Sequence, residues 1–296
     1  MRVDVGRNHG GMARYLIYNY DLAFAVNGTT SWHTKVDRAD KHIRELEEVI
    51  KEYFSAANPS ILWTFDDAVD HWEARLQLPF DLPAEVGVIV GDIIHNLRSA
   101  LDARMFQILS DRSTAALGTG RRVPTPSRYA FPVCKNLESL RKGDWHQQLG
   151  DEVLFQAVKH QQPFAYVDEG ATPPTGLERD KRIESHPLSV LHSASIVDKH
   201  HAVHATLCFM KMVWMSVPNG TDIEFLPGDP RPWADGSVVI RARITKGDRS
   251  AKLSPDGRVG VTLAANAAST YPVPLIGGMR ILQSYVVAAL EALKKF

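Results

Sequence analysis

The spacing of apolar residues changes along this chain, and that change constrains the fold more than any other feature. Up to about residue 205 most apolar residues recur at the three- and four-residue steps of helices, whereas residues 206–264 alternate as strands do. Helices precede strands without strand–helix–strand alternation, which predicts an α+β fold. We expect residues 34–205 to form a mainly helical core with a small hairpin. Residues 206–296 would add antiparallel strands and a closing helix, and residues 1–33 an N-terminal segment, all within one compact unit.

The helical part contains three long predicted helices. Residues 34–55 carry apolar residues on one face and charged residues between them, and Pro59 ends that segment. Pro83 stands where proline is tolerated, in the first turn of a second helix that runs to about Asp111. Pro187 begins a third, which we expect to continue to about Ala205. Shorter pieces follow the same reasoning: helices at 136–141 and 152–160, an extended piece at 131–133 and a loop at 170–176.

The strands are predicted in two places. Residues 60–65 and 71–78 alternate apolar and polar side chains and are expected to pair as a hairpin. Later segments are rich in β-branched residues and are bounded by Gly, Pro and Asp, which indicates an antiparallel meander; they are residues 206–216, 222–226, 237–246 and 258–264. A helix over residues 279–295 is expected to close the fold.

Composition excludes several classes of protein. Lys plus Arg equals Asp plus Glu at 34 each, so no global charge attracts the chain to nucleic acid or membrane, and any such binding needs a local patch. Two cysteines, far apart in sequence, exclude a disulfide framework and a CxxC metal site. The N-terminus has no clean signal-peptide core, and the apolar run 207–217 is too short to span a bilayer. These features predict a soluble cytoplasmic protein that does not bind membranes.

The polar face of the second helix carries the first candidate site. His95 and Asp102 lie on the side opposite the apolar residues, with Arg98 at the edge of that arc. An imidazole, a guanidinium and a carboxylate one turn apart can exchange protons and bind an anion. The alternative is an ordinary solvated helix face, because most charged faces only meet water.

The third helix carries the second candidate site. Its apolar residues lie on more than one side, which is typical of a central helix, so Asp198 would be partly buried and in need of a partner. His200 and His204, four residues apart, would share a helix face and could bind a metal, although no acidic ligand accompanies them there. Walker A, GxGxxG, GxSxG and HExxH motifs are all missing from the sequence.

The segment GDIIHNLRSALD, the later FPV and the helix ending in DKHH together resemble a widespread group of bacterial and phage proteins. The recurring pattern of that group is GD-x-x-HNLRSALDH, a short FP segment and a helix ending in DKHR. The match covers roughly residues 83–201, and its first motif is the more specific. This resemblance implies an architecture and a site rather than a reaction.

The group's arginine and its final histidine form R-x4-H, similar to the ribonuclease motif of HEPN helical domains. In those domains an arginine and a histidine on one helix act on RNA across a dimer, so the resemblance also implies a homodimer. This chain departs from the pattern at two positions. Arg98 is present, but the histidine position is Ala103, and the DKHR arginine position is His201. A ribonuclease of this kind would be impaired here or would use His95 or His200 instead.

If the two motif helices pack side by side, Asp198 can pair with Arg98, and both motifs would contribute to one site. Our first hypothesis is therefore a HEPN-like protein that binds or cleaves RNA, or another phosphate-containing ligand, without metal or cofactor. Its site would consist of His95, Arg98, Asp102, Asp198 and His200, with Arg98 holding the phosphate. Two alternatives are a non-catalytic regulatory protein, in which the cluster is structural, and a metal-dependent hydrolase that uses His200 and His204.

Overall fold

The computed structural model describes residues 31–116, 130–143, 151–169, 173–200, 204–216, 222–229, 234–247, 254–264 and 274–296. Within some of these ranges only the backbone is described, at residues 31, 113–116, 197–200, 204–216 and 254–264. The described helices are α1 (Ser31–Ala57), α2 (Ala84–Ala116), α3 (Leu137–Arg141), α5 (Glu152–His160), α6 (Pro163–Asp168), α7 (Gly176–Ser185), α8 (Pro187–His200) and α9 (Leu275–Ala292). The described strands are β1 (Ser60–Asp66), β2 (His71–Gln77), β3 (His204–Ser216), β4 (Asp222–Pro227), β5 (Val238–Lys246) and β6 (Ser254–Ala264). The predicted α+β class is confirmed.

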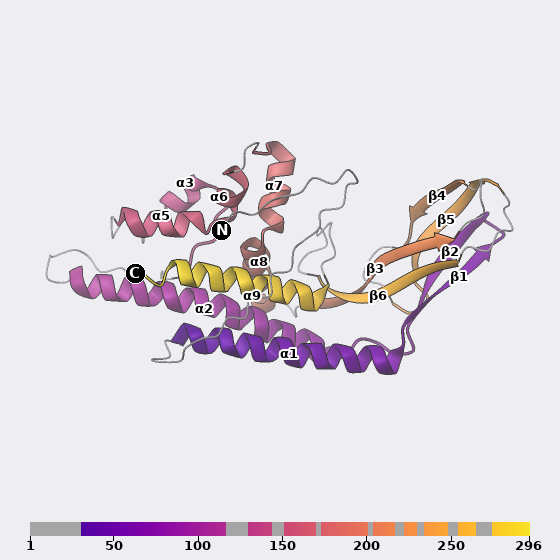
Figure 1. Cartoon of the computed structure of the whole chain (residues 1–296), viewed down its shortest axis with the longest axis horizontal. Helices are drawn as coiled ribbons and strands as arrows, with labels where there is room; N and C mark the ends of the chain where they lie inside the picture. The colour runs from indigo at the N-terminus through magenta and orange to yellow at the C-terminus, as the bar shows by residue number, and fades with distance from the viewer. Residues whose placement is uncertain are drawn as a thin grey trace.

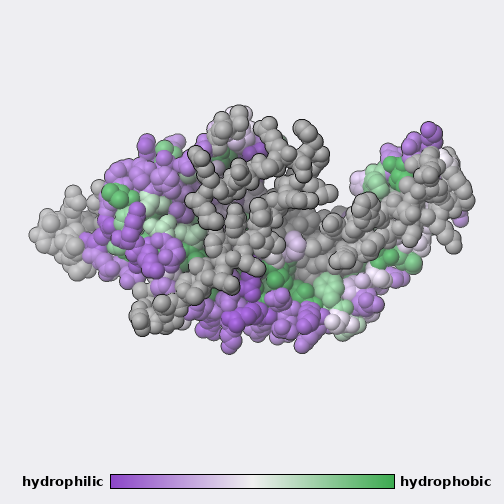
Figure 2. Space-filling model, in the orientation of Figure 1, coloured by the Kyte–Doolittle hydropathy of each residue, from purple (hydrophilic) through white to green (hydrophobic). Residues whose placement is uncertain are grey.

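Helices α1, α2 and α9 run side by side along the long axis of the molecule, and the strands lie at one end (Figure 1). Each helix turns an apolar face toward the other two, and the fully buried side chains there include Ile43, Leu46, Ile94, Leu97, Met279 and Val286. Burying one such side chain contributes about 1.5–3 kcal/mol, so this contact dominates the stability of the helical part. The outer face of α1 is hydrophilic, as the lower edge of Figure 2 shows.

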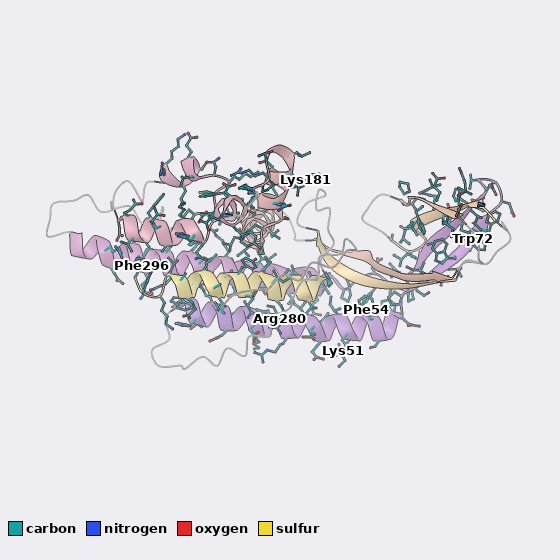
Figure 3. The ribbon with its side chains drawn as sticks, turned by 45° about the horizontal axis from the view of Figure 1, so that its top comes forward. Lys51, Phe54, Trp72, Lys181, Arg280 and Phe296 are labelled. Atoms are coloured by element: carbon teal, nitrogen blue, oxygen red, sulfur yellow. The ribbon has the colours of Figure 1, made fainter. Side chains whose placement is uncertain are left out.

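A surface ion pair joins the two helices that are furthest apart in sequence. Arg280 of α9 lies against α1 (Figure 3) and donates to Asp40 Oδ1, which also accepts from the amide of Gln283 at 3.3 Å. Burial raises the pKa of Asp40, but hydrogen bonds from Gln283 and Arg280 outweigh it, so the net pKa lies below its ordinary value. The polar rim of the helix layer therefore carries specific α1–α9 contacts.

The ends of the first helix and of the hairpin agree with the sequence. Asn58 takes a left-handed conformation (φ 41°) after α1, and Pro59 prevents the helix from continuing. The predicted hairpin is confirmed: β1 and β2 are antiparallel, with Trp63 opposite Ala74. The side chain of Asp66 accepts from the N–H of Ala68 at 3.0 Å, which tightens the turn.

The later strands are antiparallel as predicted, but they do not form one continuous meander. Strand β3 pairs with β6 in a two-stranded sheet, whereas β4 and β5 join the early hairpin in a four-stranded sheet of order β1-β2-β5-β4. The pairing of β2 with β5, in the middle of this sheet, places Trp72 of β2 opposite Ala242 of β5. Trp72 lies at the far end of the molecule (Figure 3). Local alternation predicts a strand but carries no information on its partner, which is why the pairing differs from the prediction.

The four-stranded sheet has one apolar and one charged face. Along β2, Trp72, Ala74 and Leu76 alternate with side chains on the other face, where buried Glu73 accepts from Arg75 and Arg241. Arg241 also donates to Asp229 at 3.0 Å. The buried carboxylate is thus compensated by two arginines, one from the hairpin and one from the later strands.

Several helices differ from the sequence prediction; among them, α2 ends later than expected, at Ala116, and α9 begins earlier, at Leu275. The predicted third helix ends earlier than expected: α8 stops at His200, and His204 already begins β3. Helices α6 and α7 were not predicted; α7 begins at Gly176, which we had assigned to a loop. In the described part of the chain α9 alone has the length and apolar composition of a membrane span, with 39% of that window buried inside the protein.

Candidate functional site

Helix α2 is buried on nearly every side, and its exposed residues form one narrow stripe. Between residues 88 and 106 only Val88, Asp92, His95 and Phe106 are exposed, with Ser99, Asp102 and Ala103 half-exposed beside them. Ordinary solvated helix faces are rich in Lys and Glu, and α1 has such a face. The stripe on α2 instead presents two carboxylates, an imidazole and a hydroxyl between two large apolar side chains.

His95 occupies the middle of this stripe. Its Nε2 lies 3.4 Å from the Oγ of Ser99, one turn further along the helix, which is a long contact for a hydrogen bond. The ring is therefore open to solvent and only loosely oriented by its neighbour. It is the most accessible acid–base group of the candidate site.

Arg98 lies behind the stripe and is 9% exposed. Its Nη2 lies 2.9 Å from Asp102 Oδ1 and its Nε 3.3 Å from Oδ2, so the pair is bidentate. Nη2 also donates to the carbonyl oxygen of Phe131 at 2.7 Å. A buried guanidinium needs such partners, because burying a charge without them costs several kcal/mol.

Asp102 completes a clamp on the same residue. Its Oδ1 accepts from the backbone N–H of Phe131 at 2.9 Å. Arg98 and Asp102 therefore satisfy both polar groups of the Phe131 backbone, as a neighbouring strand would. The Phe131 side chain is fully buried in the helical core. The two motifs noted in the sequence, HNLRSALD and FPV, thus meet in one set of hydrogen bonds.

Gln162, which sequence reasoning missed, holds the next part of this segment. It precedes α6 and is 0% exposed. Its Nε2 donates to the carbonyls of Pro132 (3.0 Å) and Val158 (3.2 Å), and its Oε1 accepts from the N–H of Cys134 at 2.9 Å. An uncharged amide outside any motif carries no signal in the sequence, so only the fold identifies it. Residues 131–134 are therefore held by side chains rather than by a sheet.

One end of the Arg98 guanidinium is left unused. Nη1 is buried and has no hydrogen-bond partner among the described residues. A guanidinium has five N–H donors; here Nε donates to Asp102 and Nη2 donates to Phe131. The two N–H groups of Nη1 remain available to an acceptor that the described chain does not supply.

The residues predicted on the third helix are only partly placed. Helix α8 packs against α2, as the shared-site hypothesis requires. Asp198 and His200 both lie in its last three residues, but their side chains fall outside the described part of the structure. The described partners of Arg98 are Asp102 and Phe131. The predicted Arg98–Asp198 ion pair thus stays a prediction.

The two histidines of the metal-site alternative do not lie on one helix, as that alternative requires. His200 ends α8 and His204 starts β3, so the two do not share a helix face. The sequence spacing favours a helix that includes His204, but the pairing of His204 with Ala264 places this residue in a strand. Among the residues that the structure describes, no group of three or more His, Cys, Asp or Glu side chains is placed to hold a metal.

A second feature missed by sequence reasoning is His186, which precedes α8 and is 6% exposed. Its Nδ1 accepts from the N–H of Leu188 at 3.2 Å, so the ring caps the helix. Tyr166 of α6 and Tyr285 of α9 pack against the imidazole, with ring centroids 5.4 and 5.2 Å away. Burial lowers the pKa of His186 to about 4. The ring is therefore neutral at pH 7 and ties three helices together.

Comparison with known proteins adds no further constraint: no protein-family model, curated protein or solved structure matches this chain.

Proposed function

We propose that this protein binds a phosphate-containing ligand, with RNA as the first candidate, at the stripe of α2. The observation that carries the proposal is the unused end of Arg98. Its Nη1 is a charged donor that is buried and has no partner among the described residues. Such a donor costs about 1–3 kcal/mol if it remains unpaired, so a ligand acceptor that completes it has a clear energetic gain.

The ligand would be bound at the polar stripe, since that is where the surroundings of Arg98 reach solvent. Nη1 itself is closed in the structure, whereas Asp102 and Ser99 are half-exposed and His95 is fully exposed. Binding at Nη1 therefore requires a side-chain movement that opens it toward the stripe. Charge-assisted hydrogen bonds of a guanidinium to phosphate are short and strong, particularly in a site that excludes water.

Binding without cleavage is the form of this function that the residues support best. Acid–base cleavage of RNA needs an oriented general acid or base, and His95 is held only by the 3.4 Å contact to Ser99. The position that carries histidine in the resembling group is Ala103 here. We therefore assign His95 a binding role. A cytoplasmic location and a phage–host setting belong to the same proposal.

The test is fluorescence anisotropy with a labelled single-stranded RNA, together with gel analysis of the RNA after prolonged incubation. Arg98→Lys removes the bidentate fork and should weaken binding by about 10-fold or more. His95→Ala changes an exposed side chain and should weaken binding severalfold at an unchanged melting temperature. Arg44→Ala, an exposed arginine of α1, serves as the control and should bind as the wild type does.

The RNA should remain intact throughout. Undiminished binding by both His95→Ala and a folded Arg98→Lys protein would refute the proposed site. Cleavage that His95→Ala abolishes would instead establish a nuclease.

A regulatory protein that binds another protein is the second candidate, and one observation favours it. Val88 and Phe106, at the two ends of the stripe, are large apolar side chains exposed on an otherwise buried helix. A second copy of the chain is the partner implied by the resemblance. Analytical ultracentrifugation should then show a dimer that Val88→Asp and Phe106→Glu dissociate, without any effect of phosphate.

A further inference from the structure

The charge state of the Arg98 clamp bears on the kind of phosphate that the site accepts. Asp102 forms a bidentate pair with Arg98, at 2.9 and 3.3 Å, so the pair has no net charge. The described residues supply no acceptor for the two N–H groups of Nη1, which are the groups proposed to meet a ligand. The site therefore offers directed hydrogen bonds but little net positive charge.

We propose that Asp102 is the specificity-determining residue of this site and selects singly charged phosphodiesters over doubly charged terminal or inorganic phosphate. This inference rests on the proposed function. A phosphodiester oxygen accepts from Nη1 and brings one negative charge. A terminal phosphate brings nearly two charges into the neighbourhood of the Asp102 carboxylate.

The cost of the second charge is large because the site is not open water. Arg98 is 9% exposed and the side chain of Asp102 is 36% exposed, so water screens the repulsion between like charges here only in part. Asp102 cannot easily relieve this repulsion by moving away. Its Oδ1 is fixed by the N–H of Phe131 at 2.9 Å, and the Phe131 side chain is anchored in the core. The carboxylate is therefore held in place by the same backbone that it helps to hold.

Asn at position 102 separates the charge from the hydrogen bonds. The amide oxygen of Asp102→Asn can still accept from the Phe131 N–H, whereas Arg98 loses its counter-charge. Glu47→Gln is the matched control, because Glu47 is an exposed carboxylate of α1 that lies outside the stripe and is not bonded to Arg98. Both variants change the net charge of the protein by the same amount, so only the paired position differs.

The probes are one single-stranded RNA with a 5′-hydroxyl, the same RNA with a 5′-phosphate, and inorganic phosphate as a competitor. The wild type should bind both RNAs with affinities within about 2-fold, and millimolar phosphate should not displace them. Asp102→Asn should gain on the order of 10-fold in affinity for the 5′-phosphorylated RNA, and phosphate should now compete. Glu47→Gln should behave as the wild type does.

The failures of the two ideas are distinguishable. If the wild type binds neither RNA at low salt, the proposed function itself is wrong. If it binds RNA but prefers the 5′-phosphate, or if inorganic phosphate displaces the RNA, the role of Asp102 is wrong while the function stands. These two measurements use the wild type alone, so they decide the question even if Asp102→Asn fails to fold. Equal gains for Glu47→Gln and Asp102→Asn would also overturn the inference.

Discussion

Arg98 and Asp102, one turn apart on α2, bind the carbonyl and the N–H of a single residue, Phe131. The relationship gives these two side chains a structural task whether or not a ligand is bound. It also means that a loss of function in their variants is informative only when the stability of each variant is measured as well, as in the comparisons with Arg44→Ala and Glu47→Gln.

Gln162→Ala should destabilise the protein by about 2–4 kcal/mol, because it leaves buried or half-buried backbone groups of Pro132, Val158 and Cys134 without their partner. Urea unfolding followed by circular dichroism measures the change. Gln156→Ala on the neighbouring helix α5 removes an amide that bonds only an exposed Glu152, and should cost about 0.5 kcal/mol or less. An equal loss of unfolding free energy in the two variants would argue against the role of Gln162 in holding residues 131–134.

Arg104→Met should loosen the end of α9. Arg104 is buried on α2, and its Nη2 donates to the carbonyls of Leu293 and Lys294 at 2.9 and 3.1 Å. These carbonyls have no partner within the helix, so their loss should raise amide hydrogen exchange over residues 290–296, next to Phe296 (Figure 3). Lys294→Ala is the control, since its exposed pair with Glu291 is weak. Unchanged exchange in Arg104→Met would show that the cap is not needed.

His186 should make stability depend on pH between about 4 and 6.5. Burial lowers its pKa from 6.5 to about 4, so in that window the unfolded chain binds the proton and the folded protein does not. Its contribution is complete above pH 6.5 and is lost as the pH falls, by at most about 3 kcal/mol. Urea unfolding at several pH values measures the loss.

His186→Asn keeps a helix-capping oxygen but does not titrate in this range, so it should flatten the pH dependence between pH 4 and 6.5. His160→Asn, on an exposed histidine of α5, should leave the wild-type profile intact. A His186→Asn protein with the full wild-type loss on acidification would place the titrating group elsewhere.

Glu73→Gln should destabilise the four-stranded sheet by about 2–4 kcal/mol, because Arg75 and Arg241 would lose the buried charge between them. Burial raises the pKa of Glu73, but hydrogen bonds from Arg241 and His71 bring it below 4.5 overall. The stabilisation it provides is therefore present above pH 4.5 and is lost as the pH falls further. Thermal unfolding at pH 7 and pH 4 tests both statements, and Glu224→Gln, at an exposed position, is the control. An unchanged stability of Glu73→Gln would show that the two arginines find other partners.

The sequence predicted the parts of the fold that depend on local spacing. The apolar face of α2 was predicted from apolar residues at steps of three and four. The β1–β2 hairpin was predicted from the alternation of apolar and polar residues on either side of Asp66 and Asp67. The polar stripe with His95 was likewise predicted. The wrong prediction concerns a long-range contact. The spacing of apolar residues predicted a helix to about Ala205, whereas His204 pairs with Ala264 and already belongs to a strand.

The candidate site was half predictable for the same reason. Arg98 and Asp102 were found from their spacing on one helix, but their partner Phe131 was expected only as an extended piece. Gln162 was missed because its importance comes from burial against residues about 30 positions away. Side-chain hydrogen bonds to distant backbone leave no periodic pattern in a sequence.

The sheet that joins β2 to β5 has a consequence for the order in which the chain folds. The contact between Glu73 and Arg241 spans 168 residues, so the hairpin is synthesised long before its neighbouring strand. Contacts of such separation slow folding, because a long loop must close before they form. During synthesis β2 therefore presents an open strand edge, and a nascent or truncated chain that ends before β4 would keep it open to pairing with other chains.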